Sequence, residues 1–260
     1  MAVITALAVG IWYARGRPLP ASEAVEPPAK DNRKFLAALA AFTVVYLVAY
    51  KTLLAFSPDF AFAFWNELPL QPCNVVAVLA IPASLLRGRI GRLLKGFCFY
   101  GGIVFAPVAL VMPVDGFSGV PLLSVNAIGF YGFHGLVLAL SVSFGTLKVY
   151  RPGWRDIPGV LLVLVLLALP VHGVNMLLRA TVYPEANYFY TYGLEGNPVL
   201  EGLKGWIPIP LVYELPLLPV MGILCAVINL LFQAGWKIAA VWRKEKAPYQ
   251  TGDERKEERL

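Results

Sequence analysis

The sequence predicts an all-α integral membrane protein, a polytopic bundle of about seven transmembrane helices with its N-terminus outside and its C-terminus in the cytoplasm. Hydrophobic residues make up 58% of the 260 residues and charged residues only 15%, and the mean hydropathy is +0.66. Apolar stretches of transmembrane length recur along the chain, and basic residues collect in alternate loops. This composition excludes a soluble globular domain.

Six apolar stretches are long enough to span a bilayer, since a helix needs about 20 apolar residues to cross about 30 Å of hydrocarbon. They are residues 34–56, 68–86, 94–112, 125–148, 157–178 and 211–236. A seventh run, 1–14, would be only about 21 Å long. No Lys or Arg precedes it and no small-residue cleavage site follows it, so we interpret it as a short or tilted span rather than a signal peptide.

These stretches predict one transmembrane domain, residues 1–236, followed by a charged cytoplasmic tail, residues 237–260. The Lys- and Glu-rich sequence after Ala247 favours a short disordered end.

The distribution of Lys and Arg predicts the orientation, because short cytoplasmic loops retain basic residues. Loops 57–67 and 113–124 contain no Lys or Arg, and loop 179–210 contains only Arg179 and Lys204. The intervening loops are basic, with Arg15, Arg17, Lys30, Arg33 and Lys34, then Arg87, Arg89, Arg92 and Lys95, then Lys148, Arg151 and Arg155. We interpret the net charge of +6 as a topology signal with some attraction to anionic lipid, and expect no nucleic-acid partner.

The polar residues of the spans collect at the predicted outer side, where they indicate one pocket open to the outer leaflet. Ionisable groups at this depth are costly and normally face a bundle interior or a wet cavity. These residues are Gln71, Cys73, Asn74, Asn126, His134, His172, Asn175 and Glu214.

A thiol and an imidazole at membrane depth are the residues needed for covalent catalysis on a lipid. A buried thiol is a poor nucleophile and requires an adjacent base, so we expect His134 to take the proton of Cys73. Attack on a phospholipid ester would give a thioester, and His134 would then activate the incoming hydroxyl group. Gln71 and Asn74 are the expected oxyanion donors. Asn126 or Asn175 is expected to orient the imidazole. His172 and Glu214 are further supporting residues of the site.

Other interpretations of the same residues stay open. Cys98 and Cys225, and Cys73 itself, can be small core residues. His134 and His172 could ligate haem, or a metal together with Cys73. A non-enzymatic lipid or small-molecule binding or transport protein is the third alternative, against which the chain shows no inverted repeat. Because no zinc-protease, paired-carboxylate or phosphate-loop motif occurs, we expect neither a cofactor nor a metal.

The long loop 179–210 contains four tyrosines and Trp206. These residues are typical of an interfacial aromatic belt or a re-entrant cap, and could also cover a lipid headgroup. Within this loop we expect Asn187 and Tyr188 to contact the substrate.

Several short motifs, taken in order, resemble the YwaF and transmembrane protein 164 family over roughly residues 34–235. They are Pro69-Leu70-Gln71-Pro72-Cys73-Asn74, Phe133-His134, Tyr150-Arg151-Pro152-Gly153-Trp154-Arg155, Asn175, and Asn187-Tyr188-Phe189-Tyr190. The resemblance implies a multi-span membrane protein whose eukaryotic member is a Cys/His acyltransferase remodelling ether phospholipids. By motif, the cysteine falls on Cys73 and the histidine on His134. The expected substrates are phospholipids or lysophospholipids, and the expected location is the bacterial cytoplasmic membrane.

Overall fold

A computed structural model describes residues 30–57, 60–112, 121–193 and 197–257 of the chain. Within these ranges the protein is helical and contains no β-strand. The α-helices are α2 (Lys30–Ala55), α3 (Pro72–Leu85), α4 (Gly88–Val111), α5 (Val125–Thr146), α6 (Ile157–Thr181), α7 (Pro198–Trp206) and α8 (Leu217–Glu257). The predicted short span at residues 1–14 lies outside the described residues.

The all-helical membrane class predicted from composition is confirmed. Five helical segments are long and apolar enough to cross a bilayer: Asp31–Ala55, Gly88–Val111, Val125–Thr146, Trp154–Thr181 and Val212–Trp236. The count of seven spans and the orientation of the termini stay predictions.

The third predicted span, 68–86, is shorter in the structure because its first residues are not helical. Gln71 is extended, with φ −70° and ψ 153°, and the 14-residue helix α3 begins at Pro72. A proline fits the first turn of a helix, where its missing N–H group is not needed. The consequence is that Cys73 lies in the first turn of α3, directly after an extended segment.

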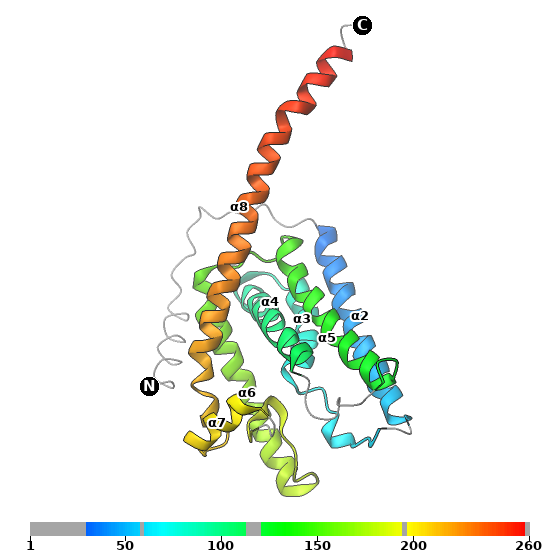
Figure 1. Cartoon of the computed structure of the whole chain (residues 1–260), viewed down its shortest axis with the longest axis vertical. Helices are drawn as coiled ribbons and strands as arrows, with labels where there is room; N and C mark the ends of the chain where they lie inside the picture. The colour runs from blue at the N-terminus through cyan, green and yellow to red at the C-terminus, as the bar shows by residue number, and fades with distance from the viewer. Residues whose placement is uncertain (1–29, 58–59, 113–120, 194–196, 258–260) are drawn as a thin grey trace.

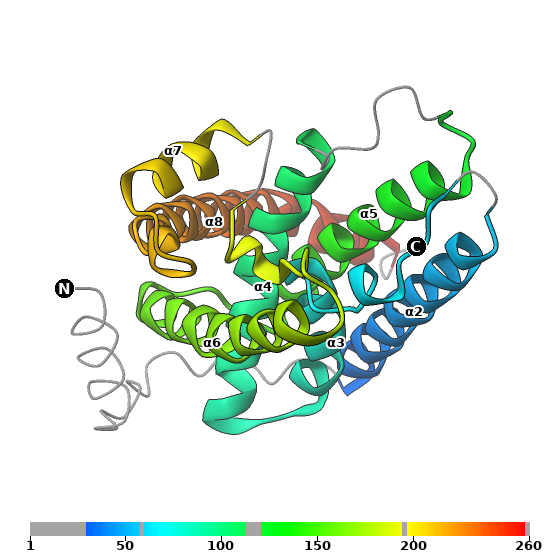
Figure 2. The same ribbon diagram turned by 90° about the horizontal axis from the view of Figure 1, so that it is seen from below.

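Helices α2 to α5 pack together as one group, and α6 joins this group through α4 (Figures 1 and 2). α8 packs mainly on α6 and also contacts α4. The α4 helix is therefore central, and half of its apolar stretch is buried. Its ring Phe99 contacts the rings of Tyr150 and Phe232, with centroid distances of 5.4 and 4.7 Å, which ties α4 to α8.

Glycines allow the helices of this group to approach closely. A Cβ atom on Gly129 of α5 would overlap the Tyr50 ring of α2, and one on Gly102 of α4 would overlap Ser141 of α5. Small residues at such crossings let two membrane helices pack backbone to backbone.

The last helix, α8, runs without interruption from Leu217 to Glu257 and projects well beyond the bundle (Figure 1). The disordered end expected after Ala247 is therefore wrong as far as Glu257. Residues 237–247 are rich in Ala, Lys and Arg, which have high helix propensity and extend a helix already nucleated by its apolar part, whereas Pro248 and Gly252, which follow, have low propensity.

Candidate functional site

The segment that follows α6 folds back over the bundle, and we call residues 182–193 the strap. It contains the 3₁₀ turn η4 (Tyr188–Tyr190), in which Phe189 and Tyr190 have φ values of 57° and 58°. Both bulky residues are in the left-handed region, which costs about 1–3 kcal/mol for each. Such a backbone persists only where its surroundings hold it firmly.

Asn175 of α6 is the main anchor of the strap and is fully buried. Its Nδ2 donates to the carbonyl oxygen of Tyr188 at 2.7 Å and to Oγ1 of Thr191 at 2.9 Å. Its Oδ1 accepts the N–H of Tyr188 at 2.8 Å. One side chain thus replaces the backbone partners that the strained turn lacks. We find no hydrogen bond from Asn175 to His134 within the described ranges.

His172, one helical turn before Asn175, also faces the strap. Its Nδ1 lies 2.9 Å from Oγ1 of Thr191, and its ring stacks on Tyr192 with a centroid distance of 5.3 Å. Arg179 covers Tyr192 at 4.3 Å and donates to the carbonyl oxygen of Ala186. The structure therefore places His172 with the strap.

The strap is also attached to the start of α3, where Cys73 lies. Gln71 accepts the N–H of Phe189 on its Oε1 at 3.2 Å. Cys73, two residues on, is a free thiol that is 6% exposed. Burial raises the pKa of the Tyr190 phenol to about 12, and Cys73 acts on it in the same direction. The strap is thus hydrogen-bonded to the segment that carries Cys73.

Hydrogen bonds from beyond the strap complete its attachment. Tyr213 donates its hydroxyl group to the carbonyl oxygen of Tyr190. The N–H of Leu211 donates to the carbonyl oxygen of Thr191 at 2.7 Å. Asn187 closes the strap internally, donating to Gly193 and accepting the N–H of Tyr192. Tyr188 is buried and donates to the carbonyl oxygen of Trp65. Asn187 and Tyr188, the two expected substrate contacts, thus hold the strap together here.

His134 lies midway along α5 and is half-buried. Its Nδ1 is 2.8 Å from the carbonyl oxygen of Phe130, and its ring contacts Phe130 at 4.3 Å between centroids. A carbonyl oxygen can only accept, so Nδ1 is the protonated nitrogen. In the neutral imidazole, Nε2 then carries the lone pair and is the atom that can act as a base.

Cys73 and His134 are not hydrogen-bonded to each other in the described part of the structure. The helix that carries His134 packs mainly on α2 and α4 and touches α3 only slightly.

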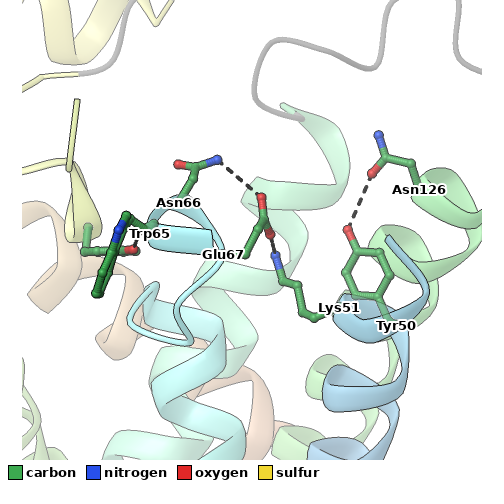
Figure 3. A network of polar contacts seen from close by, with 7 residues as sticks. Tyr50, Lys51, Trp65, Asn66, Glu67 and Asn126 are labelled. Atoms are coloured by element: carbon green, nitrogen blue, oxygen red, sulfur yellow. Dashed lines mark hydrogen bonds and ion pairs between the residues drawn. The ribbon is translucent and has the colours of Figure 1, made fainter. Parts of the chain in front are cut away.

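Polar contacts join α2 to the segment before α3 and to the start of α5 (Figure 3). Lys51 and Glu67 form an ion pair, and Asn66 donates to the same carboxylate at 3.3 Å. Tyr50 directs its hydroxyl group at Oδ1 of Asn126, at 3.4 Å. The amide oxygen of Asn126 is thus engaged by Tyr50, and no hydrogen bond to His134 occurs among the described residues.

The remaining predicted residues are placed as follows. Asn74 is buried beside Cys73 at the start of α3. Glu214 lies in the 3₁₀ turn η5 (Val212–Glu214), and its Oε1 is buried without a hydrogen-bond partner among the described residues. In the same ranges, no group of three or more His, Cys, Asp or Glu side chains could hold a metal ion.

Sequence reasoning missed the positions of Tyr190 and Thr191, and the Lys51–Glu67 ion pair. Tyr190 stood out only as one of several loop tyrosines, since nothing in the sequence marks a residue that will adopt a left-handed backbone. Thr191 is fully buried, which is unusual for a polar residue within a loop. Both residues became identifiable only once the strap was seen folded onto α3 and α6.

Comparison with known proteins found no match among curated proteins and none among solved structures. The TMEM164 family model matches residues 1–225. Together with five apolar helices of transmembrane length, this match identifies an integral membrane protein. Because the match covers most of the chain, the protein belongs to the TMEM164 family.

Proposed function

We propose that the protein is a phospholipid acyltransferase, or transacylase, that carries the acyl group as a thioester on Cys73, in the outer half of the membrane. The observation that supports this proposal best is the surroundings of the two residues. Cys73 is a buried free thiol two residues after Gln71, to which the strap is hydrogen-bonded, and the Phe130 carbonyl leaves Nε2 of His134 as the basic atom. The family resemblance makes the same two residues the catalytic pair.

In the first half of the reaction, Nε2 of His134 takes the proton from the Cys73 thiol. The sulfur attacks the ester carbonyl of a phospholipid, the C–S bond forms, and the ester C–O bond breaks. The lysophospholipid leaves as an alcohol, taking its proton from the imidazolium. Gln71 is a suitable oxyanion donor, because the bond from Phe189 fixes its Oε1 and so orients its Nε2.

In the second half, Nε2 of His134 takes a proton from the hydroxyl group of an acceptor lysophospholipid. The alkoxide attacks the thioester, the new ester C–O bond forms, the C–S bond breaks, and the thiolate recovers the proton. Water in place of the acceptor would give hydrolysis. The reaction requires the start of α3 and α5 to approach each other, since the two helices touch only slightly.

The test is the intact mass of the purified protein after incubation with phospholipid in liposomes. We expect a fatty-acyl increment that hydroxylamine removes, present in the wild type and absent from Cys73→Ala. His134→Ala should form the adduct at least about 100-fold more slowly, the loss typical of a removed general base.

Cys98→Ala and Cys225→Ala are matched controls, because both residues are also buried free thiols. Their adducts should form as in the wild type. An adduct that survives in Cys73→Ala, or the absence of any adduct together with unchanged lysophospholipid levels, would refute the proposal and favour a lipid-binding protein.

A further inference from the structure

Four basic side chains meet at the end of the bundle opposite Cys73, and we call Arg33, Arg87, Arg92 and Lys95 the basic cluster. Arg33 lies in the first turn of α2, Arg87 is the N-cap of α4, and the other two lie in its first two turns. The charges of Arg33, Arg87 and Arg92 all act on Lys95. The 14 residues of α3 separate this region from Cys73 by about 20 Å.

The described residues neutralise this charge only in part. Arg92 forms a bidentate ion pair with Asp156, at 2.7 and 2.9 Å, and Asp156 also accepts the Tyr150 hydroxyl group at 2.8 Å. Lys95 is 6% exposed, and its ammonium group donates to the carbonyl oxygen of Leu86 at 2.7 Å. Asp31 of α2 is exposed and forms no ion pair within the described ranges.

Arg33 is the member whose surroundings point to a ligand. Its Nε and Nη1 atoms are buried and have no hydrogen-bond partner among the described residues. Burying guanidinium donors without an acceptor is costly. Guanidinium N–H groups donate strong, charge-assisted hydrogen bonds to the oxygens of a phosphate or carboxylate oxyanion.

The surface beside Arg87 exposes several apolar side chains. Leu85, Leu86 and Ile90 are 56%, 43% and 68% exposed beside Arg87 at the junction of α3 and α4. In a membrane protein, exposed side chains of this kind contact acyl chains. A ligand here would therefore have its anionic group at the cluster and hydrocarbon beside it.

We propose that the basic cluster binds a phosphate oxyanion, with Arg33 as the hydrogen-bonding ligand and Arg87 and Lys95 supplying charge. The apolar surface favours the phosphate of an anionic phospholipid over free phosphate as the source. This site is separate from the chemistry proposed at Cys73.

Native mass spectrometry of the whole protein in detergent tests the proposal, with phosphatidylglycerol and phosphatidylcholine of identical acyl chains as probes. The wild type should retain phosphatidylglycerol preferentially, and Arg33→Gln should weaken this binding roughly tenfold, as expected for lost charge-assisted hydrogen bonds. Arg87→Gln, at an exposed position where folding is spared, should weaken it several-fold.

The matched control is Lys34→Gln, which removes the same charge from the adjacent, exposed position of α2. It should leave binding within about twofold of the wild type, since an exposed charge contributes little. A second arm measures thermal unfolding with inorganic phosphate. Stabilisation of the wild type but not of Arg33→Gln by phosphate, without lipid preference, would support the oxyanion site and assign free phosphate as its source.

Two results would overturn the proposal. One is equal weakening of phosphatidylglycerol binding by Arg33→Gln and Lys34→Gln, which would indicate general attraction of a basic surface. The other is a wild type that neither distinguishes the two lipids nor responds to phosphate.

Discussion

A single buried amide holds the strained turn of the strap in place. Asn175 satisfies both the N–H and the carbonyl group of Tyr188, and it shares Thr191 with His172. Polar groups of a loop that becomes buried must find partners in the protein, because no water replaces them. Asn175 therefore holds the strap in its place beside the segment that carries Cys73.

Replacing Asn175 by Ala should release the strap. The change leaves the N–H and carbonyl groups of Tyr188 without partners, at a cost of about 2–4 kcal/mol for the closed arrangement. We expect Cys73 to react faster with a thiol-specific reagent, by tenfold or more, while Cys98 and Cys225 stay protected. Peptide mapping after timed labelling measures all three rates.

Asn197→Ala is the matched control for this experiment. Asn197 caps α7 by accepting the N–H groups of Val199 and Leu200, so the substitution costs about 1 kcal/mol locally. It should not change the labelling of Cys73. Equal labelling rates in Asn175→Ala and the wild type would show that Asn175 does not hold the strap over the thiol.

At the scale of elements, α5 depends on glycines for its approach to α2. Gly129 faces the ring of Tyr50, and Gly132 faces the hydroxyl group of Tyr46, which donates to the carbonyl oxygen of Ile128 at 2.9 Å. The interface is thus built from large aromatic residues on one helix and bare backbone on the other. Adding even a methyl group there forces the helices apart.

Gly129→Ala should destabilise the protein by about 1–3 kcal/mol, the usual cost of overpacking a well-packed core. Gly135→Ala, on the same helix, is its control, because a Cβ atom there has no neighbour within 4 Å. That change should be neutral, or stabilising by up to about 1 kcal/mol through helix propensity. Thermal unfolding of both variants in the same detergent measures the difference, and equal melting temperatures would contradict the proposed close packing.

The helices themselves were largely predictable from hydropathy, because a bilayer demands long apolar segments and little else. The predicted stretch 125–148 corresponds to α5 at Val125–Thr146, and 157–178 to α6 at Ile157–Thr181. The short helix α7 was not predicted, since nine residues carry no transmembrane signal. The start of α3 was also missed, although Pro72 marks it. Hydropathy averaged over a window of residues does not show where a helix begins.

At the scale of the whole molecule, the two ends of the bundle differ in chemistry. The strap and α7 lie at one end, and the start of α2, with the basic cluster, lies at the other (Figure 1). From the sequence alone, the polar and basic residues could be assigned to one end of the helices or the other, but not to their partners. The hydrogen bonds between Asn175 and Tyr188, and the lack of a described partner for Arg33, depend on how segments distant in sequence pack. Hydrophobic periodicity does not encode that packing.

The basic end should face the cytoplasm, because basic residues resist translocation. A cysteine introduced by Gly202→Cys, on exposed α7, should react in intact cells with a membrane-impermeant maleimide. One introduced by Lys34→Cys should react only after lysis. Both positions are exposed, and the three native cysteines are buried, so the comparison is direct. The opposite pattern would reverse the predicted orientation.

The attachments of the strap have a consequence for biosynthesis. They join Trp65 and Gln71, near the start of α3, to Tyr188 and Phe189, more than a hundred positions later, and Tyr213 must then arrive to bind Tyr190. A nascent chain that ends before η5 therefore lacks the last of these bonds. Attachment of the strap is therefore a late event in assembly, and a chain truncated after α6 would leave Gln71 without its contact to Phe189.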